Sequence, residues 1–330
     1  MYINKIKVLV VGATGLVGRE ILKILSEINV PIENVFGAAS AYSDYCRICY
    51  GANGEVVIQD LEKVNFKNYD VALFSAGSDV SEKYVPKALN AGCYVIDNTS
   101  FFRMHADVPL IVPEINMEAV GTSKLIANPN CSTIQAVLPL KPLHDLYSLK
   151  DVVFSTYQSA SGAGKDGIQE LEDQFKALNE KKYIKNNIFK HQLAYNVIPA
   201  IGNIDISNYT AEELKMINET KKILDLPNIS VTATCVRVPV MVGHAVSVTA
   251  YFERKVNMFE TLTALSRYPG ISFSDNCFTP IDVAGKNDVF VTRLRQVPEL
   301  NNGVTFWVVA DNLRKGAALN AVQILQKLCE

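Results

Sequence analysis

Long apolar runs, blocks of like charge and regularly spaced cysteines are all scarce in this sequence of 330 residues. No stretch approaches the roughly eighteen uninterrupted apolar residues that a membrane span requires. The 32 basic and 34 acidic residues nearly cancel, so neither nucleic acid nor an acidic membrane surface is an expected partner. The cysteines are odd in number and lack the dense spacing of a disulfide scaffold. We therefore expect a cytoplasmic protein with a small-molecule substrate.

Other signals are absent as well. The N-terminal residues lack the charged region and apolar stretch of an export signal. Cys46 and Cys49 form a C-x-x-C pair, but no second pair and no nearby histidine completes a zinc site, so no metal is expected. Repeats, low-complexity tracts and flexible linkers are not found. At 330 residues, 48% of them apolar, the chain exceeds one typical core and predicts two domains.

Up to residue 128, short β-branched runs alternate with helical patterns. The predicted strands are 6–11, 34–39, 71–74, 94–96 and 125–127, and the predicted helices are 17–25 and 80–90. This alternation is typical of a doubly wound α/β domain with a parallel sheet.

Beyond residue 128 the predicted strands become longer and alternate more, at 152–158, 230–238, 245–252, 289–297 and 304–310. Such strands favour an antiparallel or mixed sheet with one covered face. Helices are predicted at 166–182, 211–224 and 314–327, the last with Ala318, Val322 and Leu325 on one stripe.

A glycine-rich loop follows the first strand. Gly12, Gly15 and Gly18 are spaced three apart, after an apolar strand and at the start of a helix. Gly12 permits a tight turn, Gly15 allows close approach of a pyrophosphate, and the amides of residues 14–17 (Thr14, Gly15, Leu16, Val17) donate to it. The alternative is a strand-to-helix turn that merely needs glycine. The context favours a dinucleotide site.

The end of the second strand carries no acidic residue. An acid there usually binds the ribose hydroxyls of NAD and repels a 2′-phosphate. This strand instead runs into Ser40, Ala41, Tyr42 and Ser43. The 2′-phosphate of NADP is thus admissible, with Ser40 and Ser43 as donors, although serines are also ordinary turn residues.

Cys131 lies where the pattern changes, in Asn130-Cys131-Ser132-Thr133, just before an apolar helical run at 134–140. A helix N-terminus stabilises a thiolate, which is the nucleophilic form. The alternative is a buried structural cysteine. Downstream, His244 follows Gly243 and lies seven residues after Arg237, which makes it a candidate acid/base.

Taken together, these segments resemble the aspartate-semialdehyde dehydrogenases over almost the whole chain. The resemblance rests on the glycine loop, residues 98–103, 128–133, 155–164, 219–222, 237–244 and 311–318. It implies a Rossmann-type domain at 1–128 plus a C-terminal helix at 312–330, and an α+β catalytic and dimerisation domain at 129–311 with a large mixed sheet. A homodimer is implied as well.

The resemblance also implies the reaction, which is reduction of L-aspartyl 4-phosphate by NADPH to the semialdehyde with release of phosphate, on the pathway to lysine, methionine and threonine. By position, Cys131 is the acyl-thioester nucleophile, His244 the acid/base that takes a proton from the hemithioacetal hydroxyl, and Gln158 the group that orients the substrate. The remaining substrate residues are Arg103, Lys222 and Asn130 for phosphate, Arg237 for the carboxylate and Glu219 for the amino group.

Ser161, Gly162 and Asn312 are cofactor neighbours by resemblance. One position departs from the family pattern, because Tyr42 stands where an arginine commonly binds the 2′-phosphate. NAD use is therefore possible beside NADP, with Arg47 as a substitute donor. The alternatives are an N-acetylglutamyl-phosphate reductase, a cofactor-free thiol hydrolase using Cys131 and His244, and a non-catalytic dinucleotide sensor.

Overall fold

The computed structural model describes residues 3–52 and 54–330. The chain forms two compact units, one of Met1–Asn130 with Ala317–Glu330 and one of Cys131–Gly316. The expected boundaries, after 128 and before 312, lie two and five residues away from these. Each unit contains its own sheet.

The first unit is built on a seven-stranded sheet with the order β3-β4-β2-β1-β5-β6-β7. All neighbouring strands are parallel except β3 and β4, which form an antiparallel pair. The strands are β1 (Val8–Val11), β2 (Val35–Ala39), β3 (Arg47–Cys49), β4 (Glu55–Asp60), β5 (Val71–Phe74), β6 (Tyr94–Asp97) and β7 (Leu125–Ala127). The predicted doubly wound domain is confirmed.

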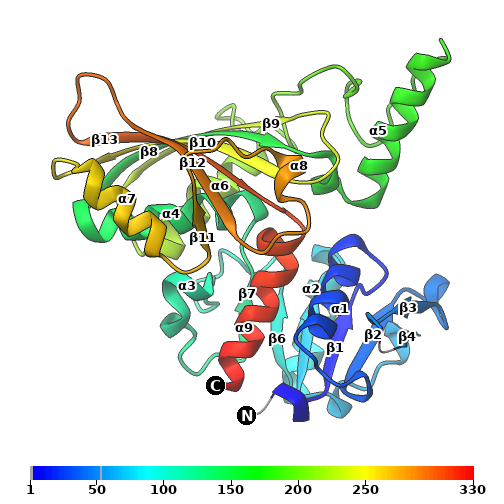
Figure 1. Cartoon of the computed structure of the whole chain (residues 1–330). Coiled ribbons are helices and arrows are strands. Elements are labelled where there is room, and N and C mark those ends of the chain that lie inside the picture. Colours follow the sequence, from blue (N-terminus) through cyan, green and yellow to red (C-terminus); the bar gives the residue numbers. More distant parts are fainter. Residues whose placement is uncertain (1–2, 53) are drawn as a thin grey trace. The chain divides into compact units, whose positions relative to one another are not determined.

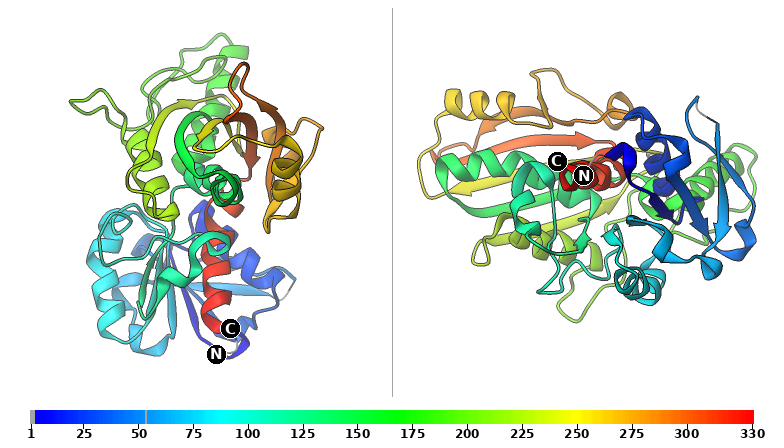
Figure 2. Two further views of the ribbon diagram at one scale, coloured as in Figure 1. Left: turned by 90° about the vertical axis from the view of Figure 1, so that its left-hand side faces the viewer. Right: turned by 90° about the horizontal axis from the view of Figure 1, so that it is seen from below.

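Helices cover both faces of this sheet because its strands are apolar on both sides. In β1, Val8 and Val10 belong to one core and Leu9 and Val11 to the other, as the alternation of strand side chains requires. The helices are α1 (Leu16–Glu27), α2 (Ser78–Asn90), the short α3 (Pro113–Asn116) and α9 (Leu319–Cys329). Figure 2 shows α9, in red, lying along the sheet, which confirms that the C-terminal helix returns to the first domain.

The second unit contains a six-stranded mixed sheet with the order β11-β12-β13-β10-β8-β9. The pairs β8–β9 and β11–β12 are parallel, and the others are antiparallel. The strands are β8 (Leu149–Gln158), β9 (Ser230–Arg237), β10 (His244–Phe252), β11 (Ile271–Phe273), β12 (Val289–Gln296) and β13 (Gly303–Ala310). The prediction of a mixed sheet is confirmed.

Its helices are α4 (Cys131–Tyr147), α5 (Gly164–Asn179), α6 (Ala211–Leu224), α7 (Met258–Arg267) and α8 (Pro280–Val283). Figure 1 shows α4, α6 and α7 on one side of the sheet. On the other side, α8 packs over one end, where Val283 joins Ala245, Phe290 and Val309. The remainder of that side, which we call the outer face, includes the half-exposed Val153 and Tyr157.

Three differences from the sequence reading have local causes. Helix α4 was expected to cover 134–140 but runs from Cys131 to Tyr147, because it continues through two prolines in a fully packed environment rather than ending at them. The hairpin of β3 and β4 was missed since its strands are short and half-polar. Helix α7 was also missed, although Asn257 caps it.

Candidate functional site

The glycine loop connects β1 to α1 as expected. Gly12 has φ of +85°, and a Cβ on it would lie 2.5 Å from the carbonyl oxygen of Ser75. A side chain is therefore excluded both by backbone conformation and by contact. A Cβ on Gly18 would lie 2.2 Å from the oxygen of Gly12, so Gly18 permits close packing of helix on strand. Gly15 precedes α1, whose first amides have no partner within the helix.

A cavity of about 720 Å³ opens beside this loop at the carboxyl ends of β2, β4 and β5, where doubly wound domains bind their ligands. Of the predicted cofactor residues, Gly12, Thr14, Gly15 and Ser40 line it. The other three predicted residues of the first unit do not line the cavity. Leu16 and Val17 form the start of α1, and Ser43 lies in the short turn that follows β2. The sequence reading missed the lining residues Ala39, Ala41, Asp60, Leu61, Glu62, Ser75, Ala76, Asp79, Val80, Lys83 and Tyr84.

An acidic residue nevertheless lies beside the end of β2, and it belongs to β4. Ala39 and Asp60 are partners in the parallel β2–β4 register, so Asp60 ends beside the strand that carries no acid of its own. Its carboxylate accepts the backbone N–H of Glu62 at 3.0 Å and lies 3.6 Å from the Lys63 ammonium. A prediction of strand β4 from the sequence would have indicated Asp60, which ends that strand.

Charges around the part of the cavity next to β2 are mixed. Tyr42 lines the cavity and is fully exposed, while Arg47 pairs with Glu55 at 3.6 Å and does not line it. Lys83, a lining residue, lies 3.5 Å from Glu62. Lys83 of α2 thus lines this cavity, whereas Arg47, which the sequence suggested as a donor, does not.

In the second unit, Cys131 is the first residue of α4 and is partly buried. A Cβ on Gly316 would lie 2.9 Å from the Cys131 Cβ, so the thiol-bearing residue packs against a position without a side chain. The helix N-terminus stabilises a thiolate by its dipole. The predicted placement of Cys131 at a helix start is therefore present in the structure.

His244 is the first residue of β10 and is completely buried. Its Nδ1 accepts the backbone N–H of Ser159 at 3.0 Å and lies 3.1 Å from the Ser159 hydroxyl. Burial, followed by the nearby Arg237 cation, lowers the pKa of His244 to about 3, and the Glu212 carboxylate opposes this shift. The imidazole is neutral at physiological pH.

Two residues predicted as cofactor neighbours support this histidine. The Asn312 Oδ1 accepts the Gly243 N–H at 2.8 Å and the Ser161 hydroxyl at 3.0 Å. The Ser161 hydroxyl lies 2.9 Å from that of Ser159. Ser161 and Asn312 are both buried. Their side chains bond to each other and to residues next to His244 in the structure, namely Ser159 and Gly243. Gly162, the third predicted neighbour, is exposed.

Arg237 is the last residue of β9, and its guanidinium donates to the carbonyl oxygen of Ser159 at 2.7 Å. Desolvation lowers its pKa, whereas negative charges on Glu212 and Cys131 raise it. These couplings place the predicted nucleophile and the predicted carboxylate clamp in one electrostatic cluster. Arg237 is buried, which strengthens its pull on an anion.

Glu212 is a further functional candidate that was not predicted from the sequence. This buried carboxylate on α6 accepts the Gln158 side-chain N–H at 3.1 Å and pairs with Lys215 at 3.0 Å. The Gln158 oxygen accepts the Thr156 hydroxyl at 3.2 Å. Gln158 is thereby held at both ends of its carboxamide. Glu212 lies in a helix rich in acidic residues, and no spacing in the sequence distinguishes it.

The remaining predicted substrate residues are divided between the units. Glu219 and Lys222 share α6, and Glu219 raises the pKa of Lys222 while burial, the larger influence, lowers it. In the first unit, Arg103 donates to the backbone oxygens of Asn128 and Asn98, each at 2.9 Å. Asn130 is the last residue before Cys131 and is buried.

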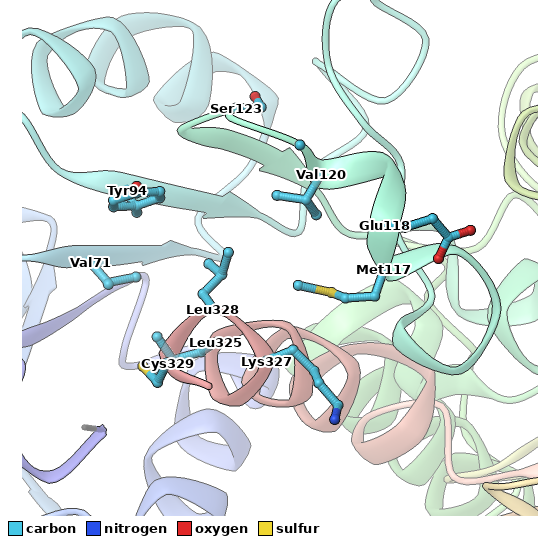
Figure 3. A pocket seen from close by; sticks show the side chains of 11 residues that line it. Val71, Tyr94, Met117, Glu118, Val120, Ser123, Leu325, Lys327, Leu328 and Cys329 are labelled. Carbon is cyan, nitrogen blue, oxygen red and sulfur yellow. The ribbon is translucent and has the colours of Figure 1, made fainter. Parts of the chain in front are cut away.

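A second cavity in the first unit is given no function. A cavity of about 530 Å³ in the first unit is lined by Val71 and Tyr94, at the amino ends of β5 and β6, and by Leu325 and Leu328 (Figure 3). It lies at the wrong end of the strands for the ligands of this fold. Among residues 3–52 and 54–330 there is no metal-ligand cluster. No helix in these described residues is long and apolar enough to span a membrane.

Comparison with known proteins identifies relatives along the full chain. Family models match two parts, the semialdehyde dehydrogenase NAD-binding domain at 7–123 and the semialdehyde dehydrogenase dimerisation domain at 140–315. Aspartate-semialdehyde dehydrogenase of Aquifex aeolicus is 45% identical, covering 98% of this chain and 97% of that protein. The Bacillus subtilis enzyme is 42% identical, covering 97% and 96%. A Vibrio cholerae aspartate semialdehyde dehydrogenase II complexed with ASA has a TM-score of 0.95 at 41% identity, covering 98% of both chains.

Proposed function

Because this chain belongs to the aspartate-semialdehyde dehydrogenases, an oxidoreductase family, we propose that it reduces L-aspartyl 4-phosphate with NADPH, releasing phosphate and L-aspartate 4-semialdehyde. The observation that carries this finer statement is the cluster in the second unit. A cysteine at a helix N-terminus is electrostatically coupled to the buried Arg237, and Arg237 in turn to His244. The reaction would serve synthesis of lysine, methionine and threonine, in a cytoplasm that keeps the seven cysteines out of disulfides.

The first unit fits a dinucleotide. The cavity beside Gly12 and Gly15 is large enough for a cofactor, and the N-terminus of α1 offers amide donors for a pyrophosphate. A bound nicotinamide supplies the hydride. Ser40 and Lys83 line the cavity and support a 2′-phosphate, so the proposed cofactor is NADPH. Because Tyr42 replaces an arginine and Asp60 and Glu62 lie nearby, NAD is accepted too.

Substrate recognition is assigned to groups of complementary charge. Arg237 binds the substrate carboxylate, since a guanidinium fork makes two parallel hydrogen bonds with a carboxylate. Glu219, almost completely buried, takes the amino group. Lys222 in the second unit is proposed as a phosphate ligand, and so, each by its position in the sequence, are Arg103 and Asn130 in the first unit. The desolvation of Lys222 strengthens its attraction for an anion.

The chemistry begins at Cys131. Its thiolate forms a bond to the acyl carbon, and the bond from that carbon to the phosphate oxygen breaks, so phosphate leaves with the electron pair. Gln158, held by Glu212 and Thr156, orients the resulting thioester. After the thioester is reduced, the carbon–sulfur bond breaks and the thiolate is restored. The Nε2 of His244 is the ring nitrogen left for the reacting oxygen.

The proposed assembly is a homodimer formed through the outer face of the second sheet. This face lies within the stretch matched by the dimerisation-domain model. It carries the exposed Val153 and Tyr157, with Tyr157 packed against Trp307 at 5.3 Å between ring centroids. A second copy would cover these apolar side chains.

The reverse reaction tests the function directly. L-Aspartate semialdehyde, phosphate and NADP⁺ are mixed, and reduced nicotinamide is followed by absorbance. We expect phosphate-dependent reduction that Cys131→Ala abolishes, and slower but measurable reduction of NAD⁺. A wild-type protein that reduces neither cofactor when phosphate is present would contradict the proposal. Cys277→Ala is the matched control, because Cys277 is an exposed free thiol.

A further inference from the structure

Three asparagines in the first unit join the C-terminal helix to the arginine that is proposed to bind phosphate. They are Asn98 after β6, Asn128 after β7 and Asn320 in α9. We infer that Asn128 and Asn320 are positioning residues for Arg103, so that α9 contributes to phosphate binding through hydrogen bonds and not by touching the phosphate. This inference rests on the proposed function, in which Arg103 is a phosphate ligand.

The Arg103 guanidinium is held by two backbone oxygens that follow different strands. Its Nε donates to the carbonyl oxygen of Asn128 and its Nη2 to that of Asn98, each at 2.9 Å. A guanidinium is a rigid, planar fork, so two acceptors on it fix the orientation of its plane. The direction in which Arg103 faces therefore depends on how residues 98 and 128 are placed relative to each other.

The side chains of the same two residues hold their backbones together. The pairing of β6 with β7 ends at Asp97 and Ala127, one residue before the two carbonyl oxygens, so the sheet ladder does not fix them. Beyond it, the Asn128 side-chain nitrogen donates to the Asn98 side-chain oxygen at 2.6 Å and to the backbone oxygen of Ala317 at 3.1 Å. Asn128 is completely buried, where a hydrogen bond is stronger than in water. Residues 98 and 128 are thus connected directly as well as through Arg103.

Asn320 sets the orientation of the Asn128 carboxamide. It is completely buried, and its side-chain nitrogen donates to the Asn128 side-chain oxygen at 2.7 Å and to the backbone oxygen of Ile111 at 2.9 Å. The carbonyl oxygens of Ile111 and Ala317 can only accept, so the nitrogen of each carboxamide must face them, and the flipped orientations are excluded. Asn320 therefore presents a donor to Asn128, and Asn128 in turn presents a donor to Asn98.

The alternative is a purely structural role, because buried polar side chains in any protein need hydrogen-bond partners. Asn116 supplies the comparison. Its side chain accepts the backbone N–H of Val112 and donates to the backbone oxygen of Leu110, each at 3.0 Å. Both bonds stay within residues 110–116, beside Ile111 but outside the chain of asparagines that leads to Arg103. Asn116 is therefore a matched control of the same residue type in the same unit.

Kinetics of the reverse reaction separate positioning from folding. Asn320→Ala removes both donors, and we expect the KM for phosphate to rise by about three- to tenfold, the effect of weakening one hydrogen bond. The KM values for semialdehyde and NADP⁺ should stay unchanged. Asn98→Ala removes the acceptor at the other end, on a half-buried residue, and should act in the same direction, so the test holds even if Asn320→Ala does not fold. Asn116→Ala should keep all three KM values.

Exchange of the Arg103 Nε–H with solvent tests the positioning without turnover, by NMR of protein labelled with nitrogen-15 in arginine. The signal is assigned by its loss in Arg103→Lys. We expect faster exchange in Asn320→Ala and wild-type exchange in Asn116→Ala, because only the first loosens the Asn128 carbonyl. Unchanged exchange in Asn320→Ala, an unchanged KM for phosphate, or equal rises in all three KM values would overturn the inference. A wild-type protein without phosphate-dependent activity defeats the proposed function instead, and the exchange measurement still decides the positioning of Arg103.

Discussion

At the scale of single residues, Glu212 contacts or influences several buried side chains around Gln158. Gln158 is held by Glu212. Burial lowers the pKa values of Arg237 and His244, and the Glu212 carboxylate opposes this lowering in both. One carboxylate on α6 thereby influences three groups assigned to the reaction. Such a residue acts by positioning, because its own oxygens are used by Gln158 and Lys215.

Glu212→Gln tests this role. The substitution keeps the shape but removes the charge that holds the Gln158 amide, and a hydrogen bond to a charged group contributes about 1.5–3 kcal/mol. We expect kcat/KM to fall between about tenfold and a hundredfold, with little change in melting temperature. Lys215→Ala, which removes only the outer partner of Glu212, should stay near wild type. Equal losses in both variants would contradict the assignment.

His244 also makes stability depend on pH. Its pKa in the folded protein is about 3, below the roughly 6.5 of an unfolded histidine, so the unfolded chain binds the proton more readily. Stability from this group is complete above about pH 6.5 and is lost as the pH falls, on the order of 2 kcal/mol by pH 5. Urea unfolding of wild type and His244→Gln at pH 7 and 5 measures the difference. Parallel losses in both proteins would refute it.

At the scale of elements, the connection from β1 to α1 determines whether a dinucleotide can bind. Gly12 combines a positive φ with close approach to Ser75, and both features position the N-terminus of α1. Strand β4, which pairs with β2, then supplies Asp60 to the lining of the same cavity. The proposed cofactor site thus depends on the β1–α1 connection and on the residue that ends β4.

Gly12→Ala should weaken cofactor binding as well as the fold. Backbone strain at such a position costs on the order of 1–3 kcal/mol, and the new Cβ would also meet the Ser75 carbonyl. Gly92→Ala is the control, because Gly92 has φ of +97° but open space around its Cβ position. Thermal unfolding and NADPH titration compare them. We expect only Gly12→Ala to lose NADPH affinity, and equal affinity in both variants would argue against the site.

At the scale of the whole molecule, the outer face of the second sheet is the part of the fold that a second copy is proposed to cover. It carries exposed apolar side chains such as Val153 and Tyr157, and the hydroxyl oxygens of Thr249 and Thr305 lie 3.1 Å apart across neighbouring strands. Exposed apolar side chains that gather on one face often mark a contact with another protein chain.

Val153→Glu should shift the protein from dimer to monomer, because a carboxylate buried between two apolar faces loses its hydration. Ile206→Glu makes the same kind of change at a fully exposed loop position and should leave the dimer intact. Sedimentation velocity measures the assembly. If Val153→Glu stays dimeric at the concentration where wild type does, the interface lies elsewhere.

Local patterns in the sequence determined the fold class. The alternation around β1, α1, β2 and β5 is a property of neighbouring residues, and so are the glycine spacing and the position of Cys131 at a helix start. Each needs only strand or helix periodicity within a short window. Elements with weak periodicity, such as β3, β4 and α7, could not be predicted from such short windows.

Only the tertiary structure decided which side chains meet. Ser159 and His244 are 85 residues apart in the chain, and Gln158 and Glu212 are 54 apart. Their contacts come from the order of β8, β9 and β10 and from the packing of α6, which no local pattern encodes. The burial of His244 and the hydrogen bond between Glu212 and Gln158 depend on these contacts, because hydrogen bonds and burial act through space while sequence patterns report neighbours along the chain.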